Sequence, residues 1–193
     1  MHAYTYGDKS LSPGKDAARA WIYSHLTRKQ FVNGVHIVIA SRTCGDIKHL
    51  HRYGAKRIIA CDTDVFARNA AAKLNAHVSP HPRLEDTVAG YLHNYGTSEL
   101  ASINVDLCAT LTYGAPVLNR VLEQLQNKRK NHSVKVFFTF CRSRFHTGGR
   151  DCLDILNSYL ADANVHVDSN KAFNYVSWTL KNKGTPMTAV VCT

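Results

Sequence analysis

The sequence predicts an α/β protein with a mostly parallel sheet, helices on both of its faces and an antiparallel hairpin at the C-terminus. Short apolar runs rich in β-branched residues alternate with helical patterns, as in sheets whose strands are covered on both faces. The last two strand-like runs, 173–180 and 187–192, are joined by only six residues. Because such a link is too short for a crossover helix, these two strands must be antiparallel.

The first predicted element is an amphipathic helix that begins at Ser12 and Pro13, a capping hydroxyl followed by a proline at the first helical position. Asn33 and Gly34 end the helical pattern. We therefore expect residues 1–34 to form a leading helical extension of one domain that spans residues 1–193. The apolar face of this helix consists of Ala17, Ala18, Trp21, Ile22 and Leu26.

Strands and helices then alternate along the chain. A continuous apolar run indicates each buried strand, and alanine-rich sequence or 3.6-residue periodicity indicates each helix. The remaining strands are expected at 35–40, 57–62, 76–78, 102–108 and 134–141. The remaining helices are expected at 45–53, 65–74, 86–95, 115–126 and 151–160.

The charge balance is basic, with 24 Lys and Arg against 14 Asp and Glu. From Gln124 through Arg150 the sequence has seven basic residues and no acid. This asymmetry fits a polyanionic partner, and it fits a solvated basic surface equally well.

The composition also bounds the class of protein. No apolar run approaches the roughly 20 residues that a membrane span needs, and the N-terminus does not resemble a secretory signal. We expect a cytoplasmic protein, in the host cytoplasm if a phage encodes it. The six cysteines and the histidines show no zinc-ligand spacing, so we expect reduced thiols and no metal site.

Ligands of doubly wound sheets bind outside the carboxyl ends of the strands, so the loops after the strands are the candidate site. The loop after the first strand, 40–46, must pass close to a ligand and open a helix. The second strand ends in Asp62, about 20 residues further on, where a carboxylate can accept hydrogen bonds from both hydroxyls of a ribose. Asp64 is interpreted as the cap of the following alanine-rich helix, with ribose binding as its alternative role.

Residues 37–73, followed by Asn104-Val105-Asp106-Leu107 and the terminal hairpin, resemble class I S-adenosylmethionine-dependent methyltransferases, and among these the small phage-encoded members. The resemblance implies a three-layer Rossmann-like methyltransferase sandwich with S-adenosylmethionine as cofactor. The first loop departs from the family pattern of one acid and several glycines, because Ser41-Arg42-Thr43-Cys44 stands there. Leu84 and Glu85 are alternatives to Asp86 at the adenine edge. By position, the implied cofactor-binding residues are Ala40, Ser41, Cys44, Gly45, Asp62, Thr63, Asp86 and Asp106.

The same resemblance places the chemistry after the fourth strand, with Asp106, Cys108 and Tyr113 as candidate catalytic residues. Methyl transfer to nitrogen or oxygen needs little beyond alignment and a base. The Asp/Asn-Pro-Pro-aromatic motif of amino-methylating DNA enzymes is missing, which disfavours that class. Cys108 with Cys141 would loosely fit a cytosine-C5 enzyme, although buried structural cysteines are far commoner than nucleophiles.

The loop after the fifth strand offers a phosphate clamp from Arg142, Arg144 and His146, with Phe145 as a stacking surface. The leading interpretation is a methyltransferase acting on a nucleic acid or another anionic substrate. A noncatalytic protein that keeps the fold to bind nucleic acid or a protein partner is the first alternative. A nicotinamide-dependent oxidoreductase is the second, and the terminal hairpin argues against it.

Overall fold

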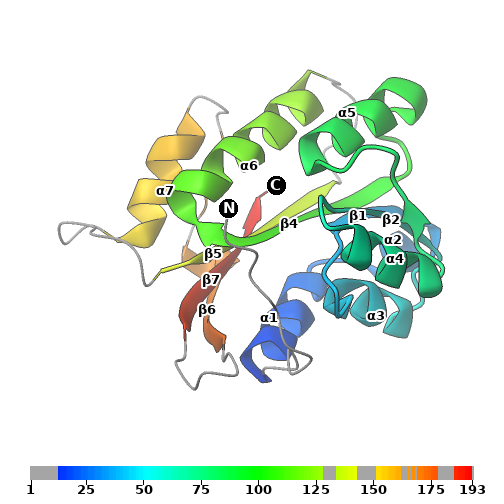
Figure 1. Cartoon of the computed structure of the whole chain (residues 1–193). Helices are drawn as coiled ribbons and strands as arrows, with labels where there is room; N and C mark the ends of the chain where they lie inside the picture. Colours follow the sequence, from blue (N-terminus) through cyan, green and yellow to red (C-terminus); the bar gives the residue numbers. More distant parts are fainter. Residues whose placement is uncertain are drawn as a thin grey trace.

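The computed structural model describes residues 13–127, 134–142, 151–161, 165, 167, 169–177 and 185–192. Its centre is a seven-stranded sheet with the order β3-β2-β1-β4-β5-β7-β6 (Figure 1). Strands β1 to β5 pair in parallel, whereas β7 runs antiparallel to both β5 and β6. The predicted mostly parallel sheet with a terminal hairpin is therefore confirmed. The strands are β1 (Val35–Ile39), β2 (Arg57–Cys61), β3 (His77–Val78), β4 (Leu100–Thr110), β5 (Lys135–Cys141), β6 (Ala172–Ser177) and β7 (Thr185–Cys192).

The helices follow the expected alternation, with differences at their ends. A short helix, α2 (Arg28–Asn33), precedes β1. The sequence analysis did not separate this helix from the first predicted helix. It begins with a capping box in which the backbone N–H of Thr27 donates to Gln30 Oε1 at 2.8 Å and the N–H of Gln30 donates to Thr27 Oγ1 at 3.2 Å. The helices are α1 (Pro13–Tyr23), α2 (Arg28–Asn33), α3 (Gly45–Arg52), α4 (Val65–Lys73), α5 (Leu84–Tyr95), α6 (Leu111–Gln126) and α7 (Cys152–Leu160).

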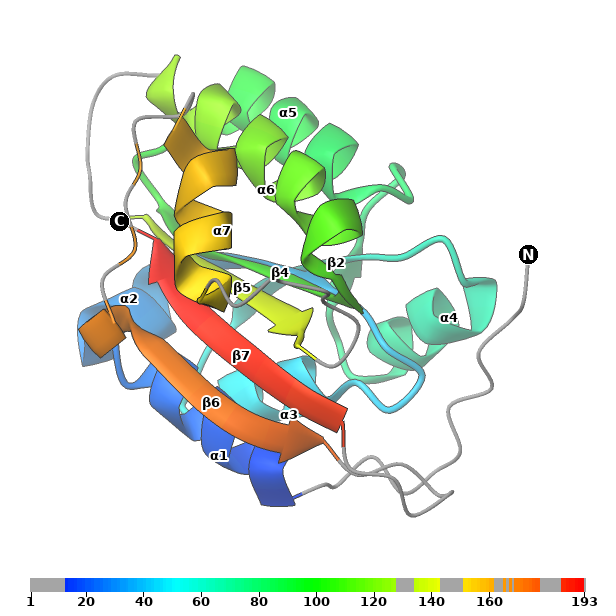
Figure 2. The ribbon, with the colours of Figure 1, turned by 90° about the vertical axis from the view of Figure 1, so that its left-hand side faces the viewer.

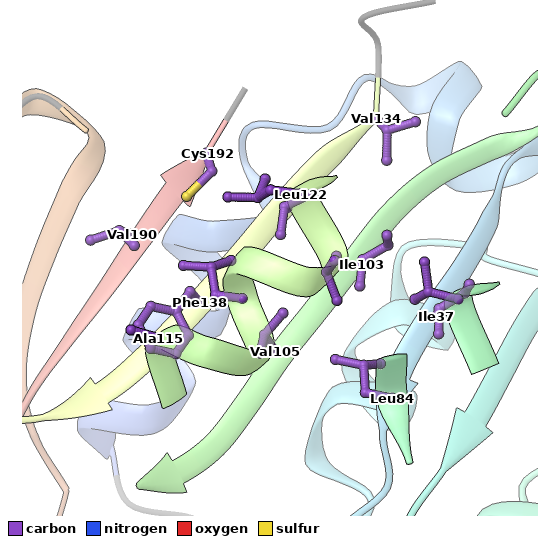
Figure 3. Packing of buried hydrophobic residues seen from close by; sticks show 14 of the residues in the cluster. Ile37, Leu84, Ile103, Val105, Ala115, Leu122, Val134, Phe138, Val190 and Cys192 are labelled. Carbon is purple, nitrogen blue, oxygen red and sulfur yellow. The ribbon is translucent and has the colours of Figure 1, made fainter. Parts of the chain in front are cut away.

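The helices form two layers, one on each face of the sheet (Figure 2). Helices α5, α6 and α7 cover one face and enclose the core drawn in Figure 3. Helices α1 to α4 cover the other face, around a second core. Neighbouring residues of a strand serve opposite cores, since Phe138 belongs to the first and Phe137 to the second.

Helix α1 is packed onto this sandwich. Helix α1 contacts β6, β7 and α3, so its residues lie against the sheet. Figure 2 shows α1 alongside the hairpin strand β6. Among the described helices, none is long and apolar enough to span a membrane.

Strand β1 lies between β2 and β4, so the strand order reverses at this point. The carboxyl ends of β1, β2 and β4 are consequently brought to one edge of the sheet. In doubly wound sheets this reversal is where a crevice for ligands opens.

Candidate functional site

A cavity of about 690 Å³ opens at the carboxyl ends of β1, β2 and β4. This volume falls within the roughly 300–1,000 Å³ of small-molecule sites. Strands, loops and helices all contribute to its lining. Strands β1 and β4 contribute Ile39, Asp106 and Leu107, the loops contribute Ala40, Ser41, Arg42, Thr43, Asp62, Thr63, Asp64, Pro82 and Arg83, and the helices contribute Lys15, Arg19, Asp46, Ala67, Leu84, Glu85 and Val117.

The loop after β1 brings two of its four predicted cofactor residues to the cavity. Ala40 and Ser41 line it, whereas Cys44 and Gly45 do not. Cys44 adopts a left-handed conformation with φ 51°, and its Sγ lies 3.1 Å from the carbonyl oxygen of Ser41, to which it donates. Burial raises the pKa of the Cys44 thiol, which favours the inert protonated form.

Gly45 has a packing role beside Arg19. A Cβ at this position would lie 2.5 Å from the guanidinium carbon of Arg19. Glycine therefore leaves the room that this buried side chain occupies.

The acid at the end of β2 lies where the sequence analysis expects it. Asp62 and Thr63 line the cavity. Burial raises the pKa of Asp62, while the backbone N–H of Asp64, which donates to Asp62 Oδ1 at 2.8 Å, acts in the opposite direction. A half-buried carboxylate at this position can accept hydrogen bonds from a ligand's hydroxyl groups.

Asp64 is the N-cap of α4, as predicted, and its Oδ1 accepts from the N–H of Phe66 at 2.9 Å. Asp64 Oδ2 accepts a hydrogen bond from Arg42 Nε at 2.6 Å, and this hydrogen bond lowers the pKa of Asp64. The guanidinium of Arg42 also lies 5.2 Å from the centre of the exposed Phe66 ring. Arg42 thus links the loops after β1 and β2.

Of the three residues expected at the adenine edge, Leu84 and Glu85 line the cavity and Asp86 does not. Helix α5 begins at Leu84, two residues before the expected start, so Asp86 is exposed and does not line the cavity. Leu84 and Glu85 do line it, and Glu85 Oε1 lies 3.3 Å from Arg120 Nη1.

Strand β4 places one of the three candidate catalytic residues in the cavity. Asp106 lines it and accepts a hydrogen bond from Thr139 Oγ1 on β5 at 2.5 Å. Tyr113 is 78% exposed on the first turn of α6 and does not line the cavity. The side chain of Cys108 lies outside the described part of the structure, and Cys141 is buried away from the cavity.

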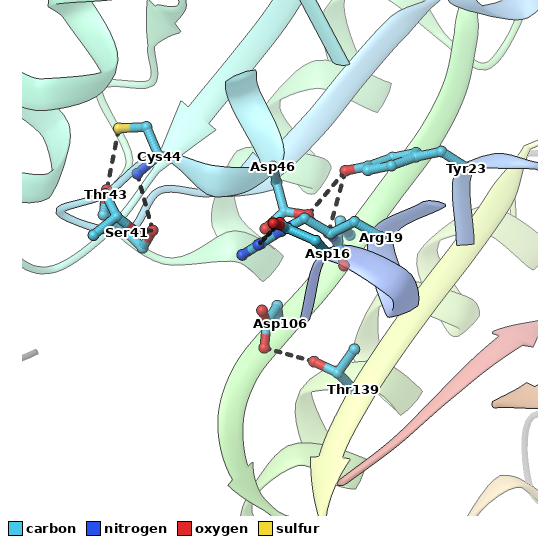
Figure 4. A network of polar contacts seen from close by, with 10 residues as sticks. Asp16, Arg19, Tyr23, Ser41, Thr43, Cys44, Asp46, Asp106 and Thr139 are labelled. Carbon is cyan, nitrogen blue, oxygen red and sulfur yellow. Dashed lines mark hydrogen bonds and ion pairs between the residues drawn. The ribbon is translucent and has the colours of Figure 1, made fainter. Parts of the chain in front are cut away.

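The wall formed by α1 is the part of the site that the sequence analysis missed. Arg19 is only 7% exposed, and its Nε lies 3.4 Å from Asp46 Oδ1 (Figure 4). The same carboxylate oxygen accepts from Tyr23 Oη at 3.2 Å and from Asn104 Nδ2 at 2.9 Å. Burial by itself would lower the pKa of Arg19, but the carboxylates of Asp46 and Asp106 outweigh it and raise the pKa above its ordinary value.

Sequence reasoning could have found Arg19 from its position, since it falls between the apolar residues Ala18 and Ile22 of the buried helix face. A charged residue inside an apolar stripe needs a partner. The partner could not be read from the same helix, because it comes from α3.

The predicted phosphate clamp lies mostly beyond what the structure describes. Arg142 is exposed, and its backbone N–H donates to the carbonyl oxygen of Pro186 at 2.8 Å. Arg144 and His146 lie outside the described residues. Within the described residues, no cluster of three or more His, Cys, Asp or Glu side chains could hold a metal ion.

No family model and no curated protein sequence matches the chain. Solved structures, in contrast, do match the chain. A candidate RNA methyltransferase from Pyrococcus horikoshii has a TM-score of 0.64 at 10% identity, covering 100% of this chain and 91% of that one. Magnesium protoporphyrin IX methyltransferase from Synechocystis, solved with bound S-adenosylmethionine, has a TM-score of 0.54 at 12% identity, covering 98% and 86%.

The chain has the class I methyltransferase fold. A third neighbour, precorrin 8w decarboxylase from Methanobacterium thermoautotrophicum, has a TM-score of 0.57 at 11% identity, covering 100% of this chain and 95% of that one. At these identities the likeness shows the methyltransferase fold and leaves the reaction and substrate of this chain to be argued from its own residues.

Proposed function

We propose that the chain binds S-adenosylmethionine in the 690 Å³ cavity and transfers its methyl group. The observation that carries the proposal is the position of Asp62, which directly follows β2 and lines the cavity beside the strand reversal of a methyltransferase fold. Its carboxylate would hold the ribose hydroxyls. Leu84 and Leu107 would give the adenine ring an apolar surface.

When bound, S-adenosylmethionine supplies an activated methyl group on a sulfonium. The contribution of the protein is then mainly alignment of the acceptor with that methyl group. Asp106, fixed by Thr139, is the cavity carboxylate nearest to the end of β4 and is the candidate for orienting the acceptor or taking its proton.

We further propose a nucleic acid or another anionic molecule as the acceptor. The formal net charge of +10 supports a polyanionic partner. Arg42 and Arg83, both exposed, lie on the cavity lining and extend this positive charge to the site. Exposed arginines next to a cavity are suited to phosphate groups.

Isothermal titration calorimetry with S-adenosylhomocysteine tests the cofactor. We expect saturable binding to the wild type and at least about tenfold weaker binding to Asp62→Ala, because a carboxylate that accepts two hydroxyl groups is lost. Asp86→Ala is the matched control, since this acid is exposed and outside the cavity. Absence of binding to the wild type would reject the enzyme and favour the noncatalytic alternative.

A further inference from the structure

The two helical layers of the sandwich carry net charges of opposite sign. Helices α1 to α4 contain eight Lys and Arg residues and two Asp residues. Helices α5 to α7 contain one Arg residue and four Asp and Glu residues. Because the two layers lie on opposite faces of the sheet, the positive charge of the described helices is gathered on one side of the molecule (Figure 2).

Most of the positive charge on this side has no acidic partner. Both acids of helices α1 to α4 pair with the buried Arg19. Five basic side chains are exposed and form no ion pair within the described residues, and we call them the basic face: Arg28, Lys29, Lys48, Arg52 and Lys73. Exposed positive charge that the fold does not neutralise attracts an anionic partner.

Helix α3 connects the basic face to the loops around the cavity. It follows the loop after β1, which lines the cavity, and Lys48 and Arg52 lie one turn apart on its exposed side. At its end the ring of Tyr53 stacks on Phe31 of α2, with 5.1 Å between the ring centres. This contact joins α3 to α2, which carries two of the five basic side chains.

Exposed aromatic rings accompany these charges. Phe66, in the first turn of α4, is 65% exposed, and the guanidinium of Arg42 lies 5.2 Å from the centre of its ring. Tyr53 is 47% exposed. Aromatic rings next to basic side chains provide stacking surfaces for the unpaired bases of a single-stranded nucleic acid.

We propose that the basic face binds the phosphates of a single-stranded nucleic acid, with Phe66 and Tyr53 stacking on its bases. A membrane surface would instead require an apolar stripe along the outer side of a helix. The exposed residues within α3 are Lys48 and Arg52, and the large exposed apolar residues of α4 are confined to its first turn.

The basic face lies outside the cavity, since none of its five residues lines it. The inference therefore does not depend on methyl transfer, and it holds equally for a noncatalytic protein. Arg42 lines the cavity and lies beside Phe66, so it connects the bound strand to the mouth of the cavity.

Fluorescence anisotropy with a labelled oligothymidylate of about 15 nucleotides tests the charges of the basic face. Lys48→Gln combined with Arg52→Gln removes two of them. We expect binding about tenfold weaker than that of the wild type. We also expect the slope of log K against log salt concentration to fall by roughly 0.7 for each lost phosphate contact.

Ala89→Glu combined with Asn94→Glu is the matched control, because it changes the net charge by the same amount at exposed positions of α5. This control should bind the oligothymidylate within about twofold of the wild type. Equal weakening by the two double variants would overturn the basic face, since net charge alone would then explain the binding. Absence of binding to the wild type at low salt would overturn it as well.

Phe66→Ala tests the stacking. It should weaken the oligothymidylate at least about fivefold and leave the salt slope unchanged, because a stacked base is lost and no phosphate contact is. Tyr95→Ala is the matched control, since Tyr95 is 67% exposed on α5 in the opposite layer. A duplex of the same length should bind more weakly than the single strand. Equal binding of the duplex, or no effect of Phe66→Ala, would overturn the single-stranded partner.

Three further probes separate this inference from its rivals. Tighter binding of phosphatidylserine vesicles or of poly-L-glutamate than of the oligothymidylate would reject a nucleic acid as the partner. S-adenosylhomocysteine should bind the Lys48→Gln, Arg52→Gln variant as it binds the wild type. Loss of oligothymidylate binding alone therefore rejects this inference, whereas loss of S-adenosylhomocysteine binding alone rejects the proposed cofactor.

Discussion

Two ion pairs lie on different walls of the same cavity, and they are built in opposite ways. The side chains of Arg19 and Asp46 are 8% and 9% exposed, and Asp46 also accepts hydrogen bonds from Tyr23 and Asn104. The side chains of Arg42 and Asp64 are 44% and 32% exposed. The first pair joins α1 to α3 inside the fold, whereas the second joins two loops at its surface.

The N–O distance of each ion pair does not indicate how much that pair contributes to the stability of the fold. The exposed pair is the shorter, at 2.6 Å against 3.4 Å, yet water screens it and competes for both of its partners. The side chains of the buried pair are 8% and 9% exposed, so little water can reach them to replace a lost partner. We therefore expect the burial of a pair and its further hydrogen bonds, more than its N–O distance, to decide how much the fold depends on it.

The largest expected effect is therefore at Asp46. Asp46→Ala should destabilise the protein by about 3–5 kcal/mol, because it leaves the charge of Arg19 buried and removes the acceptor of Tyr23 and Asn104. Urea denaturation followed by circular dichroism measures the change. Asp46→Asn, which keeps one acceptor oxygen, should lose clearly less. A loss of under about 1 kcal/mol in Asp46→Ala would show that the network is not needed for stability.

A buried base without a carboxylate partner should behave differently from Arg19. His36 is fully buried, its Nδ1 lies 2.8 Å from Ser102 Oγ, and burial lowers its pKa to about 4. The unfolded chain, with a histidine pKa of about 6.5, binds the proton more readily. The contribution of neutral His36 to the free energy of unfolding is therefore fully present above about pH 6.5. It is lost as the pH drops toward 4, which lowers the free energy of unfolding by about 3 kcal/mol.

Urea denaturation between pH 7 and pH 4 measures this dependence. The pKa of His49 is also lowered by burial, which adds to the slope, while the raised pKa of Asp62 opposes it at the acidic end. His36→Gln removes one titrating group and should flatten the curve. An unchanged slope in this variant would assign the pH dependence to other residues.

Much of the fold could be predicted because a continuous apolar run in the sequence directly indicates a buried strand. The run from Val134 to Cys141 indicates a strand without knowledge of its neighbours, and the loops of the site follow from the strand ends. The sequence analysis therefore named Asp62 and Asp106, and both line the cavity. Details of backbone conformation were not, since the positive φ of Cys44 and the early start of α5 at Leu84 leave no clear mark in the sequence.

The partners of Arg19 in the α1 wall could not be predicted, because these contacts are tertiary. Asn104 and Asp46, whose hydrogen bond holds the network together, are 58 residues apart. The packing of α1 on β6 decides where Arg19 lies, and no local pattern specifies that packing.

The smallest expected effect is at the exposed pair. Arg42→Ala should leave the thermal midpoint unchanged within error, because Asp64 still caps α4 through its bond with the N–H of Phe66 and water replaces the guanidinium. Asp64→Asn, which keeps a capping oxygen, should behave alike. If either variant lost as much stability as Asp46→Ala, exposure would not be what distinguishes the two pairs. The arginine at the surface would then be as necessary to the fold as the one inside it.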